Sequence, residues 1–165
     1  MIPYIQSNKI RKAYAKVLEA KSGIDIALTK RYDLLTHSYA ILNKYLDGET
    51  RLVKEAIQIH QNMSAQEMSD ASRYMDDLAR RLIDTVRLNM ETNTNPVFQE
   101  VLKQIQDSEE HLQAARRLYN ANVTILNELI CSYTGRKIAE KMNIDEEYYF
   151  EAYSHKKEDV EFQRK

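Results

Sequence analysis

The chain has 165 residues, of which 43% are hydrophobic and 30% charged, and its formal net charge is -1. It contains 3 glycines and 2 prolines, too few for a sheet of many hairpins, so the composition favours long helices with one apolar stripe. The balanced charge argues against a nucleic-acid-binding protein, because such proteins usually carry a basic excess. The single cysteine excludes an internal disulfide and fits a reducing compartment.

The sequence also indicates where the protein works. It contains no apolar run of about 18 residues that would span a bilayer, and its first residues lack the apolar core of an export signal. We therefore expect a cytoplasmic domain. The stretch from Met1 to Tyr4 fits either a natural start or a protein trimmed behind a membrane anchor.

The first expected helix covers residues 4–46. Counting from Ile10 in alternate steps of four and three, eight of the eleven positions up to Tyr45 are apolar or tyrosine, which indicates a coiled-coil-like seam. Gly23 lies inside this helix, where it costs about 1 kcal/mol relative to alanine. We expect this glycine to mark the close approach of another helix.

The second expected segment covers residues 49–91, and its apolar stripe is interrupted at His60 and Ser64. Residues 64–67 read Ser-Ala-Gln-Glu, which matches a capping box that starts a helix. Two interpretations remain open: one continuous helix, or a helix that bends or breaks near Ser64. The stripe consists of Val53, Ile57, Met68, Ala71, Met75, Leu78, Leu82 and Val86.

The third expected helix begins at Asn95 and Pro96, because asparagine caps helices and proline suits the first helical position. Eight of the ten positions in its seam, from Phe98 to Ile130, are apolar or tyrosine.

A short fourth helix should cover residues 136–142, directly after Gly135. Asp145 should then cap a turn or short helix through residues 148–150. Residues 154–165 are mostly charged and form a tail outside the folded domain.

Short connections make neighbouring helices antiparallel. We therefore predict an all-α, antiparallel up-and-down bundle of three long helices and a short C-terminal fourth helix, with residues 1–153 forming one domain. In this order the first and third helices run parallel, and residue i of the first lies level with about residue i+92 of the third, from the rise per residue.

Several segments resemble motifs of the LemA family. Residues 24–34 resemble its first-helix motif, in which an aspartate precedes Arg-Tyr-Asp-Leu, and residues 45–49 resemble its Tyr-x-x-x-Glu turn. Residues 108–123 resemble its Glu…Ala-Arg-x-x-Tyr-Asn-x-x-Val run. Asn127 falls at the second asparagine of the family, and residues 149–151 resemble its Tyr-Phe ending.

The likeness covers roughly residues 9–153, although three prolines of the family's turns are missing here. It implies a helical bundle of uncertain molecular function with no established catalytic residues. Most LemA-like proteins carry an N-terminal transmembrane helix that leaves the helical domain in the cytoplasm, and this chain shows none. The resemblance therefore implies membrane association through an anchor or through partners, at the inner face of the cell membrane.

We assign no catalytic, cofactor or metal site from the sequence. The Glu-x-x-His pairs of di-iron bundles, the His-Glu-x-x-His zinc motif and glycine-rich phosphate loops are absent. Asp33 and His37 share one helix face, but without further ligands a local hydrogen bond or a solvated face is the better interpretation. Cys131 has no histidine near it in sequence, so we expect a buried structural thiol.

Five polar side chains interrupt the seams of the first and third helices. We interpret them as ion pairs that fix the register of the bundle, a well-attested device, rather than as a buried polar site. The five are Lys21, Arg31, Ser38, Glu109 and Arg116. In the parallel register, the predicted partners are Asp25 for Arg116, Lys21 for Glu109, and Asp33, aided by Asn120 or Asn127, for Arg31.

These features predict a non-enzymatic interaction or scaffold protein that needs no cofactor and works through protein partners. The alternative is a metal- or ligand-binding bundle, including an enzyme. Elemental analysis of the purified protein and a search for a polar cavity separate the two. Stoichiometric metal, or carboxylates that converge on a cavity, would favour the alternative.

Overall fold

The computed structural model describes residues 2–45 and 63–151, and 88% of them are helical. Among these residues there are five helices and no strand, which confirms the predicted all-α bundle. The helices are α1 (Ile2–Tyr45), α2 (Ala65–Leu88), α3 (Met90–Asn93), α4 (Pro96–Cys131) and α5 (Tyr133–Lys141). The expectations for Val53, Ile57, His60 and the charged tail lie outside the described residues.

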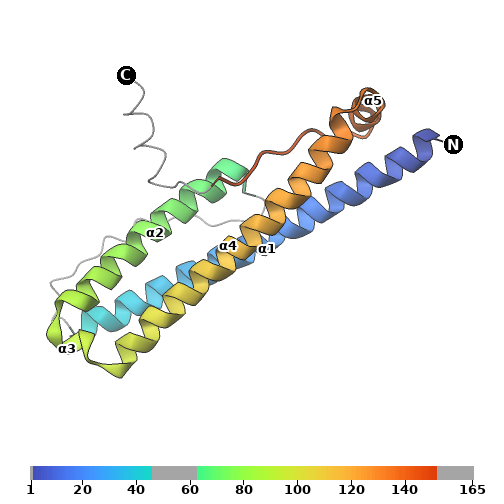
Figure 1. The fold of residues 1–165 in the computed structure, drawn as a ribbon. Helices are drawn as coiled ribbons and strands as arrows, with labels where there is room; N and C mark the ends of the chain where they lie inside the picture. The colour runs from blue at the N-terminus through green and yellow to red at the C-terminus, as the bar shows by residue number, and fades with distance from the viewer. Residues whose placement is uncertain (1, 46–62, 152–165) are drawn as a thin grey trace, which may run out of the picture.

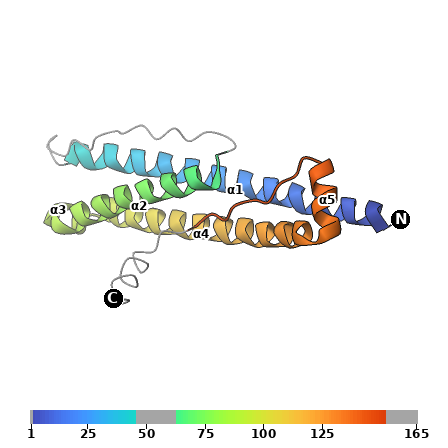
Figure 2. The ribbon, with the colours of Figure 1, turned by 90° about the horizontal axis from the view of Figure 1, so that it is seen from above.

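The two longest helices, α1 and α4, form an antiparallel pair (Figures 1 and 2). Near the start of α1, Gln6 Nε2 donates to the Ser132 hydroxyl at the end of α4, 3.2 Å away. In the second half of α1, Arg31 Nη1 lies 2.6 Å from Glu109 Oε2, which belongs to the first half of α4. The predicted parallel register of these two helices is therefore wrong.

The direction of α2 explains this error, because α2 runs the same way as α1 (Figures 1 and 2). Contacts between them advance together along both helices: Arg31 meets Asp76, and further on the Tyr39 hydroxyl donates to Leu78 O. The prediction assumed one helix that returns directly after a short turn. In the structure residues 46–62 separate the end of α1 from the capping box of α2.

The capping box decides between the two interpretations left open at Ser64. The Ser64 hydroxyl accepts a hydrogen bond from the Glu67 N–H at 3.2 Å, and the Ser64 N–H donates to Glu67 Oε2 at 2.7 Å. A helix therefore starts here, because both groups satisfy N–H donors that a new helix leaves unbonded. The predicted stripe of α2 is buried at Met68, Ala71, Met75, Leu82 and Val86.

Asparagine caps shape the connection from α2 to α4. Asn89 Oδ1 accepts from the N–H groups of Glu91 and Thr92, which starts the single turn of α3. Asn95 Oδ1 accepts from the Val97 N–H at 2.9 Å, so the predicted start of the third long helix is confirmed.

The short helix α5 begins earlier than predicted, at Tyr133 rather than after Gly135. Ser132 caps it by accepting from the Gly135 N–H at 3.0 Å, which places the glycine inside the first turn. A Cβ at this glycine would lie 1.9 Å from Leu129 O, so the close turn from α4 into α5 requires glycine here.

Residues 144–151, here called the strap, follow α5 without forming the predicted turn or short helix. After α5 ends at Lys141, Asn143 lies in the left-handed region at φ 51°, and the Ile144 N–H donates back to Ala139 O at 3.0 Å. The strap then runs back along α4 towards the start of α2 (Figure 1). The strap and α2 thus lie end to end over the α1–α4 pair.

Two further expectations are wrong. A Cβ added at Gly23 would meet no atom within 4 Å, so none of the described residues approaches it closely. Gly23 instead lines a groove of about 520 Å³ between α1 and α4. Cys131 is exposed, because it follows buried Ile130 at the last position of α4 and faces away from the core.

Candidate interaction site

The seam between the three long helices contains an ion cluster centred on a buried arginine. Arg31 is 3% exposed, and its Nη1 lies 2.8 Å from Asp76 Oδ1 and 2.6 Å from Glu109 Oε2. The cluster joins α1, α2 and α4, one charged side chain from each helix. The sequence indicated Arg31 and Glu109 but not Asp76. The position of Asp76, next to Met75 of the apolar stripe, is the feature of the sequence that indicates it could lie at the seam.

The charges of this cluster do not cancel, because one guanidinium faces two carboxylates. Burial raises the pKa of Asp76 above 3.8, the neighbouring Arg31 opposes this rise, and Glu109 adds to it. We interpret the cluster as a tie that fixes the three helices relative to one another.

The other predicted pairs change with the antiparallel register. Lys21 lies ten residues before Arg31 and is therefore level with a position about ten residues after Glu109, so the predicted approach of Lys21 to Glu109 is wrong. Asp25 lies six residues before Arg31 and is therefore level with a position about six residues after Glu109, close to Arg116. Asp25 and Arg116 are both half-buried, and their pairing stays a prediction.

The predicted partners of Arg31 lie elsewhere. Asp33 is exposed, and so is His37, and the described residues hold no group of three or more metal-ligating side chains. Asn120 and Asn127 bind the strap instead of Arg31.

Each of the two asparagines forms a pair of hydrogen bonds with one residue of the strap. Asn120 Nδ2 donates to Phe150 O at 3.0 Å, and Asn120 Oδ1 accepts from the Phe150 N–H at 2.9 Å. Asn127 Nδ2 donates to Glu147 O at 2.9 Å, and Asn127 Oδ1 accepts from the Glu147 N–H at 3.0 Å. An amide side chain therefore meets the main chain as a neighbouring strand would.

The spacing of the asparagines requires an extended strap. They are seven residues apart on α4, which corresponds to about 10.5 Å at the helical rise of about 1.5 Å per residue. Their partners Glu147 and Phe150 are three residues apart, which spans about 10 Å only in an extended conformation. Two turns of helix thus match three residues of extended chain.

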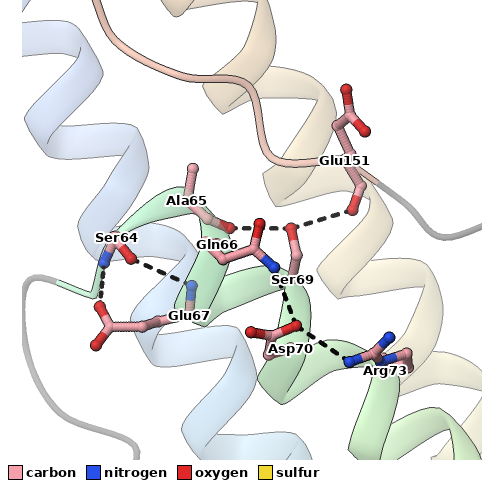
Figure 3. A network of polar contacts seen from close by, with 8 residues as sticks. All are labelled: Ser64, Ala65, Gln66, Glu67, Ser69, Asp70, Arg73 and Glu151. Carbon is pink, nitrogen blue, oxygen red and sulfur yellow. Dashed lines mark hydrogen bonds and ion pairs between the residues drawn. The ribbon is translucent and has the colours of Figure 1, made fainter.

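Two further hydroxyls bind the main chain of the strap. The buried Tyr119 hydroxyl donates to Tyr148 O at 2.9 Å, and burial raises the pKa of Tyr119 to about 12. From α2, the Ser69 hydroxyl donates to Glu151 O at 3.2 Å, beside the capping box of that helix (Figure 3). Side chains of two helices therefore hold the strap through its peptide groups.

The side chains of the strap divide into buried and exposed ones. Ile144 and Phe150 belong to the core, with 7% and 1% exposure, whereas Tyr148 is 81% exposed. A pocket of about 520 Å³ lies between the strap and the start of α2. It is lined by Ser64, Ala65, Gln66, Ser69, Tyr148, Tyr149 and Glu151.

Sequence reasoning placed Asn120 and Asn127 at the right helix but gave them the wrong partner. Two features of the sequence indicate the correct partner. The seven-residue spacing puts both asparagines on one face of α4, and the aromatic residues 148–150 follow the short fourth helix and can fold back onto that face. Tyr119 was counted only as an apolar seam position, and its hydroxyl contact was missed.

No helix among the described residues is long and apolar enough to cross a membrane. No curated protein sequence matches the chain. The family model for the LemA family matches residues 20–163, which is most of the chain and includes the ion cluster and the strap. The chain therefore belongs to the LemA family.

Proposed function

We propose that this protein is a non-enzymatic interaction protein, a scaffold that holds a polypeptide segment in extended conformation along α4. The observation that supports this proposal most directly is the pair of two-way hydrogen bonds from Asn120 and Asn127 to main-chain groups. Peptide recognition by strand addition uses the same principle, because main-chain hydrogen bonds supply affinity for an extended segment.

The strap occupies this surface within its own chain and competes with any segment from outside. A tethered segment acts at an effective concentration of the order of millimolar, so a free peptide binds only when the strap is weakened. Phe150→Ala weakens it, because truncating a buried phenylalanine costs about 3–5 kcal/mol.

The test is fluorescence anisotropy with a labelled peptide of residues 144–151 and the full chain. We expect saturable binding to the Phe150→Ala protein and much weaker binding to the unchanged protein. Adding Asn127→Leu to Phe150→Ala should abolish binding. The matched control adds Asn122→Ala instead, because this asparagine of α4 contacts Lys16 O and not the strap.

Absence of binding to a Phe150→Ala protein that keeps its helical circular dichroism would contradict the proposal. If Phe150→Ala fails to fold, Phe150→Leu replaces it, because leucine keeps most of the core filled while fitting the space of the phenylalanine ring less well.

We further propose that the protein works in the cytoplasm near the cell membrane. The support for this is the resemblance to LemA-like proteins, which are mostly anchored by a transmembrane helix. Fractionation of native cells followed by a carbonate wash tests it. Recovery of the protein only in the soluble fraction, with no peripheral association, would contradict membrane proximity.

A further inference from the structure

We infer that the strap site selects its polypeptide by two apolar anchors six residues apart and by two main-chain N–H groups, while three of the side chains between the anchors are free to vary. This inference rests on the proposed function and adds a rule for the ligand. The rule comes from the chemistry of the strap, because the structure shows its contacts with the site.

The anchors are Ile144 and Phe150, which are buried at either end of the strap. Ile144 follows the left-handed Asn143 just after α5, and Phe150 lies beside the Asn120 amide. Their burial among apolar side chains favours a ligand with an aliphatic residue at the first position and a large aromatic or aliphatic one at the seventh.

The N–H requirement follows from the two asparagines. The N–H groups of Glu147 and Phe150 are donors to Asn127 and Asn120, so a ligand cannot have proline at either position. The distance between the asparagines also fixes the register. Inserting one residue between these two positions would align only one of the two amide pairs.

Among the described residues, three positions of the strap carry exposed side chains that form no hydrogen bond or ion pair with α2 or α4. Asp145, Glu146 and Tyr148 are exposed, and Tyr148 is held through its carbonyl oxygen alone. Tyr149 differs, because its hydroxyl lies 3.3 Å from the Thr124 hydroxyl. A ligand is therefore free at the second, third and fifth positions.

The ligand class is an extended segment of another polypeptide with apolar residues at positions one and seven and no proline at positions four and seven. The strap regulates access, because a partner binds only when its segment outcompetes the tethered one. Weak partners are thereby excluded.

The experiment measures a series of unlabelled peptides as competitors of the labelled strap peptide on the full-length Phe150→Ala protein. Replacing the residues at the three free positions by serine should change the dissociation constant by less than about threefold. Phe150→Ala in the peptide, N-methylation at Glu147, and a one-residue insertion between Glu147 and Phe150 should each weaken binding at least about tenfold.

The outcomes separate the two proposals. If the parent peptide fails to bind, the proposed function falls and this inference falls with it. If the parent peptide binds but the serine peptide loses more than about tenfold, or the N-methylated peptide binds equally well, the inference is overturned and the proposed function stands.

Discussion

Removing the guanidinium of Arg31 is the most direct test of the ion cluster. Arg31→Met keeps the apolar stem but leaves the carboxylates of Asp76 and Glu109 facing each other without a cation. Breaking a buried ion pair costs about 3–5 kcal/mol. The side chains of Asp76 and Glu109 are 41% and 34% exposed, so both carboxylates regain water, and we expect a loss between the buried and the surface range, about 2 kcal/mol.

Urea unfolding followed by circular dichroism measures this loss, with an unchanged m-value as evidence that the denatured state is unaffected. Glu109→Gln alone should cost less, because Arg31 keeps its contact with Asp76. The double variant Arg31→Met/Glu109→Gln should show a coupling energy of about 1–2 kcal/mol between the two side chains. As a matched control, Arg80→Met removes an exposed pair with Asp77 and should cost less than about 1 kcal/mol.

If Arg31→Met cost no more than Arg80→Met, the argument from burial would be refuted. The cluster would then behave as a surface ion pair, and the apolar seam alone would have to fix the three helices.

Three further predictions concern single side chains. Asp76→Asn should flatten the dependence of stability on pH, because the raised pKa of Asp76 in the folded state gives a stabilisation that is complete below about pH 3.8 and is lost as the pH rises through the raised value. The urea midpoints of the variant at pH 4 and pH 7 should therefore differ less than those of the unchanged protein, and an equal difference would contradict this. Ser64→Ala should lower the free energy of unfolding by about 1 kcal/mol, because it removes the N-cap of α2. An unchanged free energy of unfolding would show that the cap does not stabilise the helix. Gly135→Ala should lower the melting temperature, because its Cβ would collide with Leu129 O, and an unchanged temperature would show that α5 shifts freely.

The long helices were predictable because their signals are local. The seams of α1 and α4 repeat every three to four residues, and the caps at Ser64 and Asn95 mark helix starts by side-chain chemistry alone. The direction of α2 was not predictable in the same way, because it depends on how residues 46–62 connect two helices and not on any local pattern. The wrong register predicted for α1 and α4 follows from the wrong direction predicted for α2.

The candidate site shows the same division. Arg31 and Glu109 stand out because they are charged residues within an apolar seam, but their pairing depends on helix direction. The strap was missed for another reason. Asp145 carries a local capping signal for a turn, and the tertiary hydrogen bonds from Asn120 and Asn127 outweigh it.

The lengths of the helices explain why an extended segment, and not a helix, covers the asparagines. At about 1.5 Å per residue, the 24 residues of α2 reach about 36 Å along the 54 Å of the 36-residue α4, which leaves about 18 Å uncovered. In this part Val123 and Leu126 are fully buried, so the seam needs a cover there. The main chain of a helix is already hydrogen-bonded internally, and it would leave the Asn120 and Asn127 amides unsatisfied at a considerable cost. An extended segment has free N–H and C=O groups that satisfy both amides. The two asparagines therefore select for extended polypeptide at this surface, whichever chain supplies it.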